Sequence, residues 1–358
     1  MTLDIVVALY AGIQELMEYL SAHVLTCLIP AFFIAGGIAA LLKTETVLKY
    51  FGASTKKWLS YTVAATSGTI LAVCSCTILP MFAGIEKKGA GIGPAAAFLF
   101  SGPAINIMAI VLTARVLGLE LGIARAIAAV SMAVIIGLIM ATIFQRGTKN
   151  KLVTSNAPIQ MATNASEGSR PAYMPVVFLA LLVGVLLSAT SQLDFALKWT
   201  IVAAFIVAAV VVLKERFSSE EKSAFLSETW SISKKIFPLL IAGTFIVGVI
   251  GYFMPFDLIR VIFGSNSFLA CFTASVVGAL LYMPTLLEIP IIGTVFGYSS
   301  GIMAPGPALS LLLAGPSLSL PSMIVIMRII GLKKGGTYIG LVVLISTFMG
   351  MLYGAIMA

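Results

Sequence analysis

The chain has 358 residues, of which 60% are hydrophobic and only 10% are charged, and its formal net charge is +8. A mean hydropathy of +1.09 excludes an ordinary soluble domain, because such domains carry about 25% charged residues. The basic residues are spread over short loops and form no contiguous patch, so they indicate membrane topology rather than nucleic-acid binding.

Charge-free segments recur along the chain at the length that a membrane span requires. A helix needs about 20 apolar residues to cross the hydrocarbon core. Residues 3–20 carry three carboxylates and are expected to form a short interfacial or capping helix. We predict an all-α, multi-pass protein of the inner cell membrane, with charge-free segments at 24–42, 58–85, 89–114, 126–145, 171–193, 199–213, 236–256, 261–287, 289–327 and 335–358.

Two stretches, 93–118 and 306–331, follow one pattern. They read GPAAAFLFSGPAINIMAIVLTARVLG and GPALSLLLAGPSLSLPSMIVIMRIIG, and both fit G-P-x7-G-P-x11-R-x2-G without a gap. Upstream, CSCTILP ending at Pro80 aligns with PTLLEIP ending at Pro290. Shared membrane composition would explain one G-P match but not this whole register, so we infer an internal duplication.

The duplication predicts how the chain is divided. The linker should contain two apolar segments, 173–191 and 196–213, followed by a charged loop at 214–235. The predicted parts are an N-terminal transmembrane repeat over 1–145, a cytoplasmic loop over 146–172, linker helices with a cytoplasmic loop over 173–232, and a C-terminal transmembrane repeat over 233–358.

Basic residues predict that the two repeats are inverted. Loop 43–57 and the turn Glu86-Lys87-Lys88 are basic, whereas their counterparts in the second half are nearly bare. Conversely, the second half has a basic turn (Arg328, Lys333 and Lys334) where the first has Arg115, Glu120 and Arg125. The positive-inside rule then places the basic turns of both halves in the cytoplasm.

The fold that agrees with this charge pattern has two inverted repeats. Each repeat would contain three spanning helices plus a re-entrant hairpin, and a two-helix linker would join them, with both termini outside. The alternative is about ten spans with proline-kinked helices.

The segment VCSCTILP places two thiols, Cys74 and Cys76, just before Pro80. In a regular helix residues i and i+2 point in nearly opposite directions, so these thiols would not share a ligand. Pro80 has no N–H for the Cys76 carbonyl, which predicts a helix break at the cysteines. Breaks in corresponding positions of two inverted halves typically mark a transporter's binding site. The alternative is that both cysteines are small fillers of helix contacts.

A second break is predicted at Gly102-Pro103, where Pro103 frees the carbonyl of Leu99. Asn106 would follow just inside the next half-helix, with free N–H groups suited to an anion or oxygen ligand. The counterparts in the second half are Gly315-Pro316 and Ser319. The alternative is a proline kink with Asn106 bound to a neighbouring helix.

Glu288 is the only carboxylate in the interval 261–327, and it aligns with Ile78. Ionisable groups at membrane depth are costly and typically act as proton relays or counter-ions. We therefore expect Glu288 to couple transport to protons. The alternative is a structural ion pair with Arg115 or Arg328.

At these residues the chain resembles the predicted-permease family that includes the bacterial organoarsenical efflux permeases. The resemblance covers most of the chain and rests on CSCTILPMFAGIEKKGAGIGPAAAFLFSGPAIN and LLAGPSLSLP. It implies export of soft metalloids, notably trivalent methylated or aromatic arsenicals, across the inner membrane. The family's C-x-C falls on Cys74 and Cys76. Thr77 stands where the family often has Gly, which suggests a different pocket shape.

These observations predict a secondary-active permease that exports a soft, thiol-reactive cargo such as a trivalent organoarsenical in exchange for protons. Two thiolates match the two exchangeable positions of a mono-organyl arsenical, and thiolate binding releases protons that Glu288 would receive. One alternative is a transporter of a sulfur-containing or other small anion, or of an unknown substrate. A non-transporting scaffold or redox protein is less favoured, because it would not need two matched breaks.

We expect no enzymatic activity, no cofactor and no resident metal ion, with Cys74 and Cys76 as metalloid ligands. The expected partners are a small-molecule or metalloid substrate and the lipid bilayer, not nucleic acid, and a homo-oligomer is left open. The residues expected to contact the substrate are Cys74, Ser75, Cys76, Thr77, Gly102, Pro103, Asn106, Pro284, Thr285, Gly315, Pro316 and Ser319.

Overall fold

The computed structural model describes residues 2–21, 28–42, 60–65, 75–144, 173–190, 194–253, 261–281 and 288–357. Within these ranges the chain is helical and forms no strand, which confirms the all-α fold class. The helices before the linker are α1 (Thr2–Tyr19), α2 (Ile29–Leu41), α5 (Ser75–Lys87), α6 (Ile92–Ala104), α7 (Ile107–Val116) and α8 (Leu119–Phe144).

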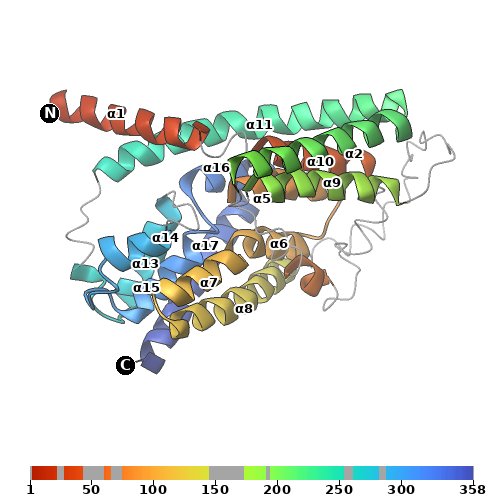
Figure 1. The fold of residues 1–358 in the computed structure, drawn as a ribbon. Coiled ribbons are helices and arrows are strands. Elements are labelled where there is room, and N and C mark those ends of the chain that lie inside the picture. Colours follow the sequence, from red (N-terminus) through yellow and green to blue (C-terminus); the bar gives the residue numbers. More distant parts are fainter. Residues whose placement is uncertain are drawn as a thin grey trace.

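Two helices, α9 (Met174–Thr190) and α10 (Phe195–Arg216), occupy the two apolar segments expected in the linker. Figure 1 shows them side by side, and α9 also packs against α2. The remaining elements are α11 (Ser219–Tyr252), α13 (Phe268–Leu280), α14 (Glu288–Pro290), the π-helical turn η2 (Ile291–Val295), α15 (Pro305–Ala314), α16 (Leu320–Ile330) and α17 (Leu332–Met357).

Four of the described helices are long and apolar enough to cross a membrane: α8, α10, α11 and α17. A fifth span results if α6 and α7, which are bent by 45° relative to one another, are counted together. Other apolar helices are half-length, including α2, α5, α13, α15 and α16. Such short helices suit broken spans or re-entrant segments, because a complete crossing takes about 20 residues. The inverted arrangement of the two repeats stays a prediction.

The prediction of a charged loop over 214–235 is wrong. Helix α10 ends at Arg216 and α11 begins at Ser219, so most of this segment is helical. The backbone N–H of Ser218 donates to Glu221 Oε2 over 3.0 Å, and the N–H of Glu221 donates to Ser218 Oγ over 3.2 Å. This reciprocal capping box starts a helix whose first half is polar and whose second half is apolar.

The two G-P stretches pack in the same way. Helix α6 lies against α8, and α15 lies against α17 in the corresponding arrangement (Figure 1). A Cβ atom on Gly137 of α8 would lie 2.8 Å from the carbonyl oxygen of Gly93, the first residue of the repeat. A Cβ atom on Gly350 of α17 would lie 2.5 Å from the carbonyl oxygen of Gly306, the corresponding residue. Glycine therefore allows the same close helix contact in both halves.

The loops that end the two stretches also match. Gly118 has φ +113° and Gly331 has φ +86°, and both stand at the last position of the shared pattern. L-residues with a side chain rarely adopt such angles, so glycine is required at both turns. The long helices α8 and α17 begin directly after them.

Helix α1 packs along the apolar half of α11. A Cβ atom on Gly248 would lie 2.8 Å from the Cα atom of Gly12, so the two helices cross closely at these glycines. The outer side of α1 exposes large apolar residues, including Val6, Tyr10 and Ile13. An apolar exterior of this kind is suited to lipid.

The close contact at Gly350 gives a test of the packing. We expect Gly350→Ala to lower the free energy of unfolding by about 1–3 kcal/mol, because the added Cβ atom would collide with Gly306 and Ser310. Gly340→Ala in the same helix is the matched control, since a Cβ atom there meets nothing within 4 Å. Thermal unfolding in detergent measures both, and equal midpoints for the two variants would contradict the contact.

Candidate functional site

The first G-P break separates α6 from α7. Helix α6 ends at Ala104, one residue after Pro103, and α7 starts at Ile107. Pro103 has no N–H to donate to the Leu99 carbonyl, which explains why the helix ends there. In the second half α15 ends at Ala314, just before Gly315-Pro316, and α16 starts at Leu320. The predicted breaks at the two G-P pairs are therefore confirmed.

Both breaks are followed by a side-chain cap. Asn106 Oδ1 accepts a hydrogen bond from the backbone N–H of Ala109 over 3.4 Å. Ser319 Oγ accepts the equivalent bond from Ser322 over 3.4 Å, and the Ser319 N–H donates to Ser322 Oγ over 2.8 Å. Asn106 thus precedes α7 as its cap and does not lie inside it. Both side chains satisfy N–H groups that the broken backbone leaves open.

Corresponding residues contact the glycines of the two breaks. A Cβ atom on Gly102 would lie 2.7 Å from Ile78 Cδ1, and one on Gly315 would lie 2.6 Å from Glu288 Oε1. Ile78 and Glu288 are the pair that the sequence alignment places opposite each other. An apolar side chain therefore covers the first break, while a carboxylate covers the second.

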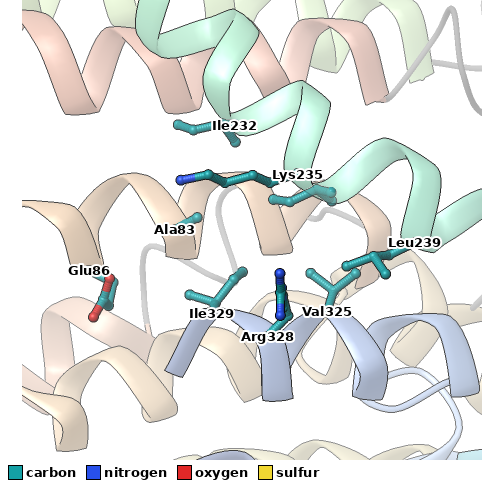
Figure 2. A pocket seen from close by; sticks show the side chains of 9 residues that line it. Ala83, Glu86, Ile232, Lys235, Leu239, Val325, Arg328 and Ile329 are labelled. Carbon is teal, nitrogen blue, oxygen red and sulfur yellow. The ribbon is translucent and has the colours of Figure 1, made fainter. Parts of the chain in front are cut away.

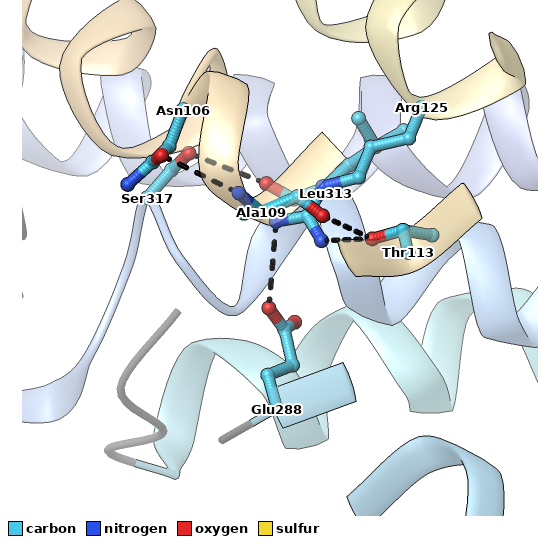
Figure 3. Close-up of polar contacts among 7 residues, drawn as sticks. All are labelled: Asn106, Ala109, Thr113, Arg125, Glu288, Leu313 and Ser317. Atoms are coloured by element: carbon cyan, nitrogen blue, oxygen red, sulfur yellow. Dashed lines mark hydrogen bonds and ion pairs between the residues drawn. The ribbon is translucent and has the colours of Figure 1, made fainter. Parts of the chain in front are cut away.

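Glu288 forms an ion pair with Arg125, a residue of α8 (Figure 3). The distance from Arg125 Nη2 to Glu288 Oε2 is 3.7 Å, and both side chains are 0% exposed. Arg125 Nη1 donates to Thr113 Oγ1 over 2.9 Å, and Thr113 donates to the Ala109 carbonyl over 2.7 Å. The pair therefore joins α7 and α8 of the first half to α14 of the second.

The ion pair leaves hydrogen-bonding capacity unused. In the part of the chain that the structure describes, Arg125 Nε and Nη2 have no hydrogen-bond acceptor, and neither carboxylate oxygen of Glu288 has a donor. A separation of 3.7 Å is too long for a hydrogen bond between the two groups. Buried charges of this kind are costly unless they are fully paired, so such sites typically serve a function.

Residues 9–355 match a protein family described as predicted permease. The chain belongs to the predicted-permease family. It is 42% identical to the UPF0718 protein MJ0584 of Methanocaldococcus jannaschii over 357 residues, which cover 96% of this chain and 95% of that protein. It is 24% identical to the UPF0718 protein YraQ of Escherichia coli over 72% of this chain and 56% of that protein. No solved structure matches the chain.

The permease is a multi-pass membrane protein of a transporter family. Its buried ion pair is not the one considered from the sequence. Arg115 and Arg328, the two expected partners of Glu288, are both exposed, and Arg125 is the partner instead. The charge pattern of the sequence places Arg125 in a turn, whereas the structure places it more than one turn inside α8. One side of that helix is buried and includes Gly122, Arg125, Ala129 and Met132 at helical spacing. This spacing places Arg125 on an otherwise apolar face, which is the feature of the sequence that indicates its burial.

A tight backbone holds Glu288 in place. Helix α14 continues directly into η2, where the N–H of Phe296 donates to the Ile291 carbonyl over 3.0 Å. Thr294 Oγ1 donates to the carbonyl of Pro290 over 2.7 Å. Pro290 aligns with Pro80, so both halves of the permease carry a proline in the helix beside the break. Single π-helical turns are found frequently at functional sites.

Other predicted site residues are placed only in part. Helix α5 begins at Ser75, Cys76 is its second residue, and Thr77 is buried in its first turn. The described residues do not include Cys74, Pro284 and Thr285, nor the side chains of Ser75 and Cys76. Among the described residues, no three His, Cys, Asp or Glu side chains gather as a metal site would need.

Removing one partner of the ion pair should strongly destabilise the permease. Arg125→Met leaves Glu288 as an uncompensated buried charge, so we expect a loss of about 3–5 kcal/mol in unfolding free energy. The double variant Arg125→Met/Glu288→Met should regain most of this loss, because both charges are removed. Unfolding in bicelles measures these values, with Arg115→Met as an exposed control. A loss equal to that of the control would show that the pair is not buried as described.

Proposed function

We propose that this permease is a secondary-active transporter of the inner membrane that exports a soft, thiol-reactive cargo, such as a trivalent organoarsenical, in exchange for protons. The observation that carries this proposal is the buried Arg125–Glu288 pair, which joins the two halves at the second break. Ionisable residues within membrane segments typically serve proton relays and substrate pathways. The chain contains no P-loop pattern, so an ion gradient is the energy source that we propose.

Protonation of Glu288 would change how the halves are held together. The ionised carboxylate attracts Arg125 and holds α14 against α8. The protonated carboxyl has no charge, so this attraction is lost and the two halves can move relative to one another. Proton binding and the arrangement of the halves are then linked. Ionised Glu288 favours the arrangement in which it contacts Arg125, and protonated Glu288 favours the arrangement without this contact.

The cargo would bind the thiols of Cys74 and Cys76. Helix α5 begins between these cysteines, and Ile78, one turn further, contacts the break at Gly102. Each thiol would displace one hydroxide from a mono-organyl arsenical, forming an As–S bond and releasing one water molecule. The thiol protons leave in that water and, unlike the expectation from the sequence, do not pass to Glu288. The proton exchanged for the cargo is therefore one that Glu288 itself binds and releases.

A second candidate function is transport of a sulfur-containing or other small oxyanion. The observation that favours it is the Nε–Nη2 edge of Arg125, which lacks a hydrogen-bond acceptor within the described residues. This edge of a guanidinium group binds oxyanions through two parallel hydrogen bonds. In this case the anion would replace Glu288 as the partner of Arg125.

The cysteines provide a test of the cargo. We expect Cys74→Ser/Cys76→Ser to abolish methylarsenite resistance in cells that lack other arsenical exporters, because a hydroxyl does not replace a thiolate as a ligand of arsenic. Cys271→Ser is the matched control: this free cysteine is buried in α13, in contact with Gly306. Normal amounts of each variant in the membrane must be shown by immunoblot. Full resistance in the double variant would exclude the thiol role, and thiosulfate uptake by it would favour the second candidate.

Glu288 provides a test of the proton exchange. In everted vesicles, Glu288→Gln should make methylarsenite uptake independent of an imposed pH gradient, because glutamine does not bind and release a proton in this range. Glu120→Gln, an exposed carboxylate at the start of α8, serves as the control. If uptake by Glu288→Gln still follows the gradient, another group carries the proton.

A further inference from the structure

A second candidate site lies away from the ion pair, between helices α5, α11 and α16 (Figure 2). The pocket has a volume of about 330 Å³, and none of its lining residues belongs to the Arg125–Glu288 site. Lys235 of α11 and Arg328 of α16 reach into it, with Glu86 of α5 at its edge. This size is at the lower end of the range for small-molecule sites, about 300–1,000 Å³.

Its polar lining carries a net positive charge. Lys235, Arg328 and Glu86 are all exposed, and within the described residues none of their side chains forms an ion pair or a hydrogen bond. Two cations and one carboxylate leave one positive charge for a ligand to neutralise. A single phosphodiester group supplies one negative charge.

The rest of the lining is apolar. Ile236 and Leu239 extend from Lys235 along one side of α11, and Val325 lies one turn before Arg328 on α16. A free phosphate ion would gain nothing from such a wall. A phospholipid would use it, because its acyl chains lie next to its phosphate.

The three charges share one level of the protein. Glu86 follows the charge-free segment 58–85, Lys235 precedes 236–256, and Arg328 follows 289–327. Each therefore stands at the end of an apolar stretch, where the hydrocarbon core meets the head-group layer. The charge pattern of the sequence places all three ends in the cytoplasm.

The turn after α5, which contains Lys88, also indicates that the charged ends of α5 and α11 lie at one level. Burial lowers the pKa of the Lys88 ammonium group, and the Glu228 carboxylate of α11 opposes that shift. The turn after α5 therefore lies beside the polar half of α11. Anionic lipids act mainly at the cytoplasmic leaflet, and basic pockets between helices on that side bind their head groups.

We propose that this pocket binds an anionic phospholipid, with Lys235 and Arg328 on the phosphate and the acyl chains along the apolar wall. Helices α5 and α16 begin at the candidate site, with Thr77 in the first turn of α5 and Ser319 capping α16. Their opposite ends carry Glu86 and Arg328 into the pocket. A bound lipid would fix these ends against α11 and so stabilise one arrangement of the two halves.

The test is thermal unfolding of the purified permease in neutral detergent during titration with phosphatidylglycerol. We expect a saturable rise of the midpoint, and each of Lys235→Ala and Arg328→Ala should weaken lipid binding roughly fivefold. Lys234→Ala is the matched control, because Lys234 is exposed next to Lys235 but does not line the pocket. The variants Lys235→Gln and Arg328→Gln replace them if an alanine variant has a lower midpoint without lipid.

Two further titrations separate the possible sources of the phosphate. Phosphatidylcholine, which has the phosphate but no net charge, and inorganic phosphate, which has no acyl chain, should both give much smaller shifts. An equal shift with either compound would overturn the proposal, as would an equal loss in Lys234→Ala. These results do not depend on arsenical export or proton exchange, so the lipid site and the transport mechanism can fail separately.

Discussion

Arg125 and Glu288 can be buried only because they meet each other. A single charge inside a membrane protein is costly, and the 3.7 Å pair compensates each charge with the other. Arg125 lies on α8 of the first half and Glu288 on α14 of the second, so the pair requires both halves to be present.

The duplicated packing surrounds a site that is not itself duplicated. Gly102 and Gly315 each accept a neighbouring side chain, but that side chain is Ile78 in the first half and Glu288 in the second. In the register of the repeat, Arg125 of α8 corresponds to Tyr338 of α17, which is also fully buried. Duplication therefore supplies two similar scaffolds, and only one of them carries the charges.

Broken helices are stable in this protein because their backbone groups find partners. Asn106 accepts from the N–H of Ala109 and Ser319 from the N–H of Ser322, so each interrupted helix has one of its open N–H groups satisfied by a cap. Irregular backbone at membrane depth is tolerated only where protein or a watery cavity satisfies it. The short helices α6, α7, α15 and α16 can thus end within the protein, next to the ion pair.

The sequence alone determined the membrane class, the repeated G-P pattern with its helix breaks, and the cost of burying Glu288, because these depend on composition and local chemistry. It did not determine the partner of Glu288, since that depends on how two distant helices dock. The sequence also predicted a loop over 214–235, where the structure has mostly helix. A capping box at Ser218 and Glu221 starts α11 there despite the high charge of the segment. Only the tertiary structure brought Arg125 to Glu288 and gathered Glu86, Lys235 and Arg328 around one pocket, because contacts between remote segments depend on packing rather than on spacing.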